Sequence, residues 1–173
     1  MLPTIANECS EFLENSHGFP LLKNLPRNQY GFRKVKVRKK KKLNDEFVKV
    51  FNNTFSEYKD LINRSIFAHG MNGFDPIIDD GLEPFFIFPI NGYKYIFSKN
   101  VTDTDEHKST LNKLVNNYGQ NGINLFQEIL KYQYSFDNLL EGISSNSEII
   151  IYNIPFYYAI RYSLIEDYEK FLS

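Results

Sequence analysis

Apolar residues recur every three to four positions in two segments of the N-terminal half, a spacing that predicts amphipathic helices. Residues 4–16 form the first helix, with Thr4 as its expected cap. Its apolar face comprises Ile5, Cys9, Phe12 and Leu13. Residues 44–63 form the second helix, which Asn44 is expected to cap. Its apolar face comprises Phe47, Val50, Phe51, Thr54, Phe55, Tyr58, Leu61 and Ile62.

Shorter apolar runs and alternating patterns predict β-strands between and after these helices. The apolar run 18–26 closes at Pro26, and residues 31–37 alternate so that one face of the expected strand is basic and solvated. Residues 64–67 predict a short strand, and a loop rich in Gly, Asp and Pro follows at 69–84.

Two further pairs of strands are expected. The sequence FFIFPINGYKYIF predicts a β-hairpin around Ile90, Asn91 and Gly92, because an Asn-Gly pair favours a tight hairpin turn. Residues 147–152 and 156–162 are the last expected strands, and Pro155 separates them.

The C-terminal half also contains helical patterns, which complete an α+β fold. Helices are expected at 105–118 and 123–141, and Ser163 with Glu166 forms a capping box for a final helix. We therefore predict a single α+β domain over residues 1–173, with mixed or antiparallel sheets flanked by helices.

Composition narrows the class of protein. Among 173 residues, 42% are hydrophobic and 24% charged, as in a globular domain and unlike a disordered chain. No apolar run approaches the roughly 20 residues of a membrane span, so no membrane partner is expected. The acidic N-terminal segment lacks a signal-peptide pattern, which argues against export.

Several kinds of active site find no support in the residue patterns. The single Cys9 excludes an internal disulfide, and it is expected to be a core thiol. His17, His69 and His107 are scattered, so no metal site is expected. The serines lack the G-x-S-x-G context of a hydrolase nucleophile, and no Gly-rich phosphate loop is present.

The charge distribution has one strong asymmetry. The segment 33–42 contains eight of the 20 basic residues and no acidic one, so all 21 acidic residues lie elsewhere. Such a run either binds a polyanion or forms a solvated strand face with a Lys-rich turn. Tyr30 and Phe32 precede it and offer stacking to single-stranded nucleic acid. The candidate polyanion ligands are Arg33, Lys34, Lys36, Arg38, Lys39, Lys40, Lys41 and Lys42.

Several segments, taken in order, resemble known families. The segment PLLKNLP is similar to the first strand of ADP-ribosyltransferase-type folds. Four segments together resemble an uncharacterised group of tailed-phage proteins. These are KVKVRKKKK, NRSIFAHG, FFIFPINGYKYIFSKNVTD and SSNSEIIIYNIPFYYAI. The bias towards Asn, Ile, Lys, Phe and Tyr, with only three alanines, is typical of AT-rich coding DNA, as in many phages.

The transferase resemblance implies a site that cleaves NAD. Glu148 would stabilise the oxocarbenium-like charge on the ribose, and Ser65 (or Ser98) would orient that glutamate. Lys23 would hold the pyrophosphate. The nicotinamide would stack on Tyr93 or Tyr95, and His69 would help to hold the nucleotide.

The sequence departs from the transferase pattern at three places. Lys23 stands where that fold has Arg, and Phe67 to Gly70 stand where hydroxyl residues are expected. Asn146 takes the place of the Glu or Gln that often precedes the catalytic glutamate by two residues.

Two hypotheses therefore stay open. The first is a phage-encoded protein with an ADP-ribosyltransferase-like fold that modifies a host target with NAD, or that has kept the fold and lost catalysis. The second is a non-enzymatic phage protein, either a virion component with assembly partners or a binder of a host factor or nucleic acid through the basic segment 33–42. Both place the protein in the host cytoplasm or the virion.

Overall fold

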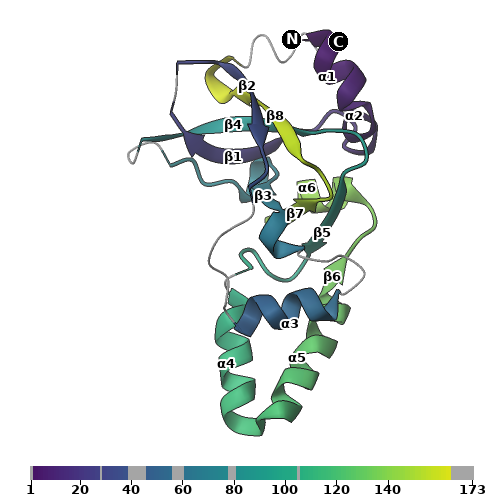
Figure 1. The fold of residues 1–173 in the computed structure, drawn as a ribbon, viewed down its shortest axis with the longest axis vertical. Helices are drawn as coiled ribbons and strands as arrows, with labels where there is room; N and C mark the ends of the chain where they lie inside the picture. The colour runs from purple at the N-terminus through teal and green to yellow at the C-terminus, as the bar shows by residue number, and fades with distance from the viewer. Residues whose placement is uncertain are drawn as a thin grey trace.

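One eight-stranded sheet organises the fold (Figure 1). The computed structural model describes residues 2–27, 29–38, 46–55, 61–77, 81–104 and 106–164. Within them the strand order is β2-β8-β4-β1-β3-β7-β5-β6, and every pairing is antiparallel. Helices accompany this sheet, so the predicted α+β class is confirmed and the sheet is antiparallel.

The strands fall mainly where apolar runs predicted them. Their bounds are Leu21–Pro26 (β1), Phe32–Lys36 (β2), Ile66–His69 (β3), Leu82–Pro89 (β4), Lys94–Ser98 (β5), Tyr134–Ser135 (β6), Glu148–Tyr152 (β7) and Phe156–Arg161 (β8). Strand β3 begins two residues later than the predicted strand 64–67, and it therefore includes His69.

The N-terminal helix is divided in two. Helix α1 (Leu2–Glu8) and helix α2 (Ser10–Asn15) meet at Cys9, and Thr4 lies inside α1 instead of capping it. The predicted apolar face is otherwise confirmed, since Ile5, Cys9 and Phe12 are fully buried. Burial raises the pKa of the Cys9 thiol to about 12, in keeping with a core thiol.

The long helix predicted at 44–63 is shorter in the structure. Helix α3 spans Glu46–Thr54, whereas Ile62–Arg64 forms a 3₁₀ turn. The expected cap Asn44 and residues 56–60 lie outside the described part of the chain.

The predicted hairpin between β4 and β5 is wrong. The turn forms, with Gly92 at a positive φ of 82°, but β4 pairs with β1 and β8 while β5 pairs with β7 and β6. The turn is bonded to the N-terminal helices instead. Asn91 accepts hydrogen bonds from Ser10 and from the Glu11 amide, and it donates to the Asn7 carbonyl. The turn therefore joins two strands that lie in different parts of the sheet.

Helices α4 (Glu106–Tyr118) and α5 (Gln120–Gln133) form an antiparallel pair that projects from the sheet, with α3 across its base (Figure 1). The predicted helix 123–141 is wrong in its second half. The chain leaves α5 at Gln133, forms the short β6, and resumes helix only at α6 (Leu139–Ser144).

Two apolar clusters cover opposite faces of the strands β3, β7 and β5. One contains Ile149 and Ile151 of β7, together with the sheet half β1, β4 and β8 and helices α1 and α2. The other contains Ile150 and Tyr152, together with helices α3, α4 and α5. Alternation along β7 therefore determines which side of the sheet each side chain reaches. Glu148 shares the face of Ile150.

The sequence also predicted a final helix and no membrane-spanning segment. A 3₁₀ turn, Tyr162–Leu164, follows β8, and the predicted final helix lies beyond it in residues that are not described. Of the helices described, none has the length and apolar character that crossing a bilayer requires.

His107 is a polar residue inside the helical cluster. Its side chain is 3% exposed and lies among the rings of Phe47, Phe126 and Tyr134. The Nε2 atom is buried without a hydrogen-bond partner among the described residues. Burial lowers the pKa of His107, and the Glu106 charge acts weakly against it, so the imidazole is neutral in the native state at neutral pH.

We predict that His107 contributes to acid destabilisation. Because its native pKa lies below the unfolded value of 6.5, the unfolded chain binds the proton first, and stability falls as the pH drops below that value. His107→Leu should reduce this loss by at most about 1.4 kcal/mol per pH unit. Denaturant unfolding between about pH 7 and pH 5 measures the effect.

The exposed His17 supplies the control. It has a positive φ of 51°, which Asn tolerates, so His17→Asn removes an exposed imidazole without straining the backbone, and the pH dependence of His107→Leu is compared with that of this variant. An unchanged pH dependence in His107→Leu would contradict the prediction.

Candidate functional site

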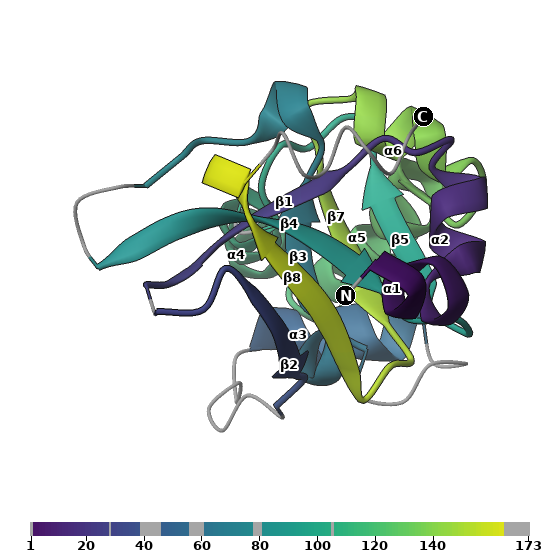
Figure 2. The same cartoon turned by 90° about the horizontal axis from the view of Figure 1, so that it is seen from above.

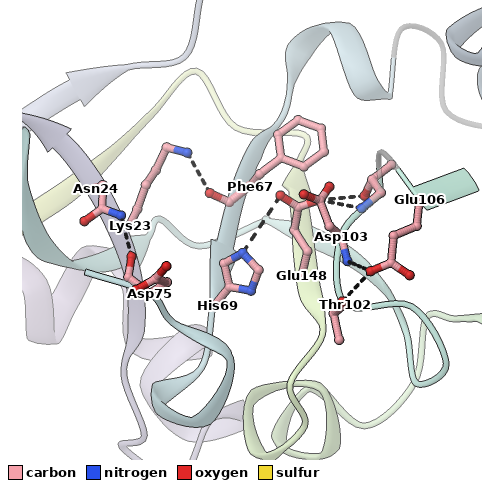
Figure 3. A network of polar contacts seen from close by, with 10 residues as sticks. Lys23, Asn24, Phe67, His69, Asp75, Thr102, Asp103, Glu106 and Glu148 are labelled. Atoms are coloured by element: carbon pink, nitrogen blue, oxygen red, sulfur yellow. Dashed lines mark hydrogen bonds and ion pairs between the residues drawn. The ribbon is translucent and has the colours of Figure 1, made fainter. Parts of the chain in front are cut away.

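Three adjacent strands bring together the residues that the sequence pointed to separately. His69 on β3 pairs directly with Glu148 on β7, and β1, which contains Lys23, lies on the other side of β3. Figure 3 shows the resulting polar network. Gly70, directly after His69, lets the chain pack closely against α6, because a Cβ there would lie 1.7 Å from the Ile143 carbonyl oxygen.

Glu148 is held by the loop between β5 and α4. Its Oε2 accepts a hydrogen bond of 2.6 Å from the Thr104 hydroxyl and one of 3.2 Å from the Thr104 amide. The Glu148 amide donates to the Thr102 carbonyl at 3.1 Å. These contacts fix one carboxylate oxygen, and the Glu148 side chain is 15% exposed, so the group is ordered yet reachable from solvent.

The same loop is itself braced at the start of α4. Glu106 accepts hydrogen bonds from the Thr102 hydroxyl and from the Asp103 amide, and the Glu106 amide donates to the Asp103 carbonyl. A carboxylate in the first turn also suits the positive end of the helix dipole. The orientation of Glu148 thus depends on how α4 begins.

His69 faces the second oxygen of Glu148. Its Nε2 lies 4.0 Å from Glu148 Oε1, and its side chain is 26% exposed. Burial lowers the pKa of His69, the Glu148 charge raises it, and the Lys23 charge lowers it. A backbone hydrogen bond with Ser147 also raises this pKa. Burial is the largest of these effects, so His69 is a largely neutral imidazole at neutral pH.

Tyr134 on β6 also lies beside Glu148 and Thr104. Burial raises the pKa of its phenol, a hydrogen bond with Thr104 acts against that rise, and the Glu148 charge adds to it. The phenol therefore stays protonated and lies beside the Thr104–Glu148 contact.

Lys23 extends from β1 towards β3. Its Nζ donates a 2.7 Å hydrogen bond to the backbone carbonyl of Phe67. The side chain of Phe67 lies on the same face as Glu148, because Phe67 pairs with Ile150. The ammonium group is close enough to His69 to affect its pKa. A cation, an imidazole, an aromatic ring and a carboxylate thus follow one another across three strands.

Ser65 does not belong to this arrangement. It lies four residues before His69, about 13 Å along the chain, and its hydroxyl donates to the Ile62 carbonyl. Ser98 accepts a hydrogen bond from the Asn100 amide. The hydroxyl that contacts Glu148 comes from Thr104 instead.

Tyr93 and Tyr95 lie on the opposite side of the sheet from Glu148. Tyr95 pairs with Ile151, and both tyrosines pack in the cluster that contains helices α1 and α2. Tyr93 is 8% exposed and accepts a hydrogen bond from Asn15. Their placement removes the expected nicotinamide wall, whereas Phe67 is an aromatic side chain on the Glu148 face, because it pairs with Ile150.

The predicted polyanion ligands divide between two faces of β2. Arg33 lies over the Phe85 ring, 4.3 Å from its centroid, and donates a hydrogen bond to the Pro26 carbonyl. Its guanidinium therefore contacts the sheet. Lys34 lies over Phe156, and Lys36 and Arg38 are exposed. Lys39, Lys40, Lys41 and Lys42 lie outside the described residues.

Sequence reasoning missed Thr104 and Phe67. Thr104 gives a weak signal, because the pattern T-D-T-D-E before an amphipathic helix marks a capped helix start. That this start meets β7 depends on the sheet order, which no local pattern encodes.

Comparison of the chain with protein-family models, curated proteins and solved structures gave no match. Among the described residues, no group of three His, Cys, Asp or Glu side chains is placed to hold a metal ion.

We predict that Glu148→Gln lowers the pKa of His69 further, because the Glu148 charge raises that pKa in the unmodified protein. A titration of the His69 ring protons by NMR measures the shift. Glu128→Gln is the matched control, since Glu128 is 72% exposed and pairs with Lys131 on α5. Equal His69 titrations in both variants would contradict the proximity of the two side chains.

Proposed function

We propose that the protein cleaves the nicotinamide–ribose bond of NAD at Glu148 and transfers the ADP-ribosyl group to an acceptor. The observation that carries this proposal is the placement of Glu148 on β7. It is anchored through one oxygen, and its other oxygen faces His69, one strand from Lys23. This agrees with the order of charged groups that the ADP-ribosyltransferase resemblance implies.

Glu148 would act on the charge that develops in the reaction. The bond between ribose C1′ and the nicotinamide nitrogen breaks, and nicotinamide leaves with the electron pair. The ribose then carries oxocarbenium-like positive charge, which a fixed carboxylate stabilises. The acceptor attacks C1′ and loses a proton. Because Thr104 holds Oε2, Oε1 is the oxygen left to face the substrate.

The surrounding groups fit a dinucleotide in three respects. The Lys23 ammonium suits a pyrophosphate, and the Phe67 ring suits a nicotinamide face. The Nε2 of the partly exposed His69 lies beside Glu148 Oε1 and suits a substrate hydroxyl. Lys23 provides a point charge, so it would bind the phosphates with less geometric constraint than Arg.

Glu148→Gln should reduce nicotinamide release from NAD by about a hundredfold to a thousandfold, because the variant keeps the shape of Glu148 and loses its charge. Release is measured by chromatography of the reaction with purified protein.

Glu128→Gln again provides the control and should retain full activity. Folding of each variant is checked by circular dichroism. Equal rates for Glu148→Gln and the unmodified protein would exclude Glu148 as the catalytic carboxylate, and absence of release from the unmodified protein would overturn the proposed function.

Thr104 should act as a positioning residue. Thr104→Val removes the hydroxyl that donates to Glu148, and kcat should fall by about tenfold to a hundredfold with little change in KM. Thr104→Ser keeps the hydroxyl and should retain kcat within a few fold. If the Ser and Val variants lost activity equally, the role of Thr104 would be packing alone.

A further inference from the structure

We infer that the acceptor is a single-stranded nucleic acid, which binds along the exposed strand β2. This inference rests on the proposed function, since an acceptor is needed only if transfer occurs. The proposed surface, called here the basic edge, comprises Lys34, Lys36 and Arg38 with the partly buried rings of Phe32 and Phe156.

The register of β2 places these groups on one face. Phe32 pairs with Ile160, Lys34 with Tyr158 and Lys36 with Phe156. Residues two apart in a strand share a face, so Phe32, Lys34 and Lys36 all lie on the side away from Arg33. Strand β2 is an edge strand of the sheet and pairs with β8 alone, so one side of its backbone is unpaired within the sheet (Figure 2).

Aromatic rings are interleaved with the cations. Phe32 stacks on Tyr158, with ring centroids 5.5 Å apart and planes 13° from parallel. Lys34 Nζ lies 3.5 Å from the centroid of Phe156, which meets Tyr158 edge-on. Tyr30, just before the strand, is 61% exposed. Cations beside aromatic faces are the combination that binds single strands without sequence preference.

Charge identifies the occupant as a phosphodiester chain. Segment 33–42 holds eight basic residues without an acidic one, and the rest of the chain is acidic on balance. Glu8 lies close to this face, and its carboxylate is engaged there, because it accepts a hydrogen bond from the Tyr158 hydroxyl. The basic edge is thus a positively charged patch on a chain that is otherwise acidic on balance. Such a patch attracts an anion with many regularly spaced charges.

The basic edge and Glu148 belong to one sheet. Four strands, β8, β4, β1 and β3, separate β2 from β7, which amounts to about 24 Å across the sheet at the usual strand spacing. A strand of nucleic acid that is anchored at β2 would therefore present a nucleotide several positions further along at Glu148. An acidic protein would meet the cations, but it would not use the aromatic rings.

The first experiment measures binding of the full chain to a fluorescent single-stranded oligonucleotide of about 16 nucleotides, at the upper end of single-strand site sizes. Each phosphate contact contributes about 0.7 to the slope of log affinity against log salt. The double variant Lys36→Ala, Arg38→Ala should therefore lower that slope by about 1.4. The control Lys113→Ala, Lys131→Ala removes the same charge from exposed positions on α4 and α5 and should leave the slope unchanged.

A second variant separates nucleic acid from an acidic protein as the partner. Tyr30→Ser should weaken binding about tenfold without changing the salt slope, because it removes stacking and no charge. Equal slopes in the two double variants would overturn the basic edge. Competition by polyglutamate as effective as that by the oligonucleotide, with no effect of Tyr30→Ser, would assign the surface to an acidic protein.

The third measurement concerns transfer. With NAD present, the oligonucleotide should gain the mass of one ADP-ribosyl group with the unmodified protein, whereas Glu148→Gln should bind it equally and leave it unmodified. Nicotinamide release without any mass gain would overturn nucleic acid as acceptor and leave the proposed cleavage standing. Binding without nicotinamide release would instead reject the proposed function, so the two failures are distinguishable.

Discussion

The contact between Thr104 and Glu148 connects the two main parts of the molecule. Thr104 lies where strand β5 gives way to helix α4, and Glu148 begins strand β7, so hydrogen bonds of 2.6 Å and 3.2 Å join the helical pair to the sheet. Hydrogen bonds to a carboxylate are stronger than neutral ones. The same contact fixes one oxygen of Glu148, the carboxylate to which the transferase resemblance assigned a catalytic role.

Burial explains why this carboxylate lies at the end of its strand. The residues of β7 after Glu148 are buried on both faces of the strand. The cluster that contains β1, β4, β8, α1 and α2 covers one face, and helices α3, α4 and α5 cover the other. Only the first position of β7 meets a polar loop, and only there does a charged group avoid the cost of full desolvation. His69, at the last position of β3, shares that end of the sheet for the same reason.

Several errors of the sequence analysis have one cause, which is that local patterns do not specify which strands become neighbours. The Asn91–Gly92 turn was predicted correctly as a turn, but the two strands that it joins pair with different neighbours, and Asn91 accepts a hydrogen bond from α2 and donates one to α1. Ser65 and His69 lie on one short segment, yet only His69 reaches Glu148 because of the register between β3 and β7. Tyr95 missed the site through alternation, since it shares a face with Ile151.

The sequence by itself determined the α+β class, most of the strands, the buried face of the N-terminal helices and the basic character of segment 33–42. These follow from periodicity and charge, which act between residues close in the chain. The tertiary structure alone decided the sheet order, the pairing of His69 with Glu148, the choice of Thr104 over Ser65 as the hydroxyl partner, and the inward turn of Arg33. Each of these depends on contacts between distant segments, and a shift of one residue in strand register would move every such side chain to the other face.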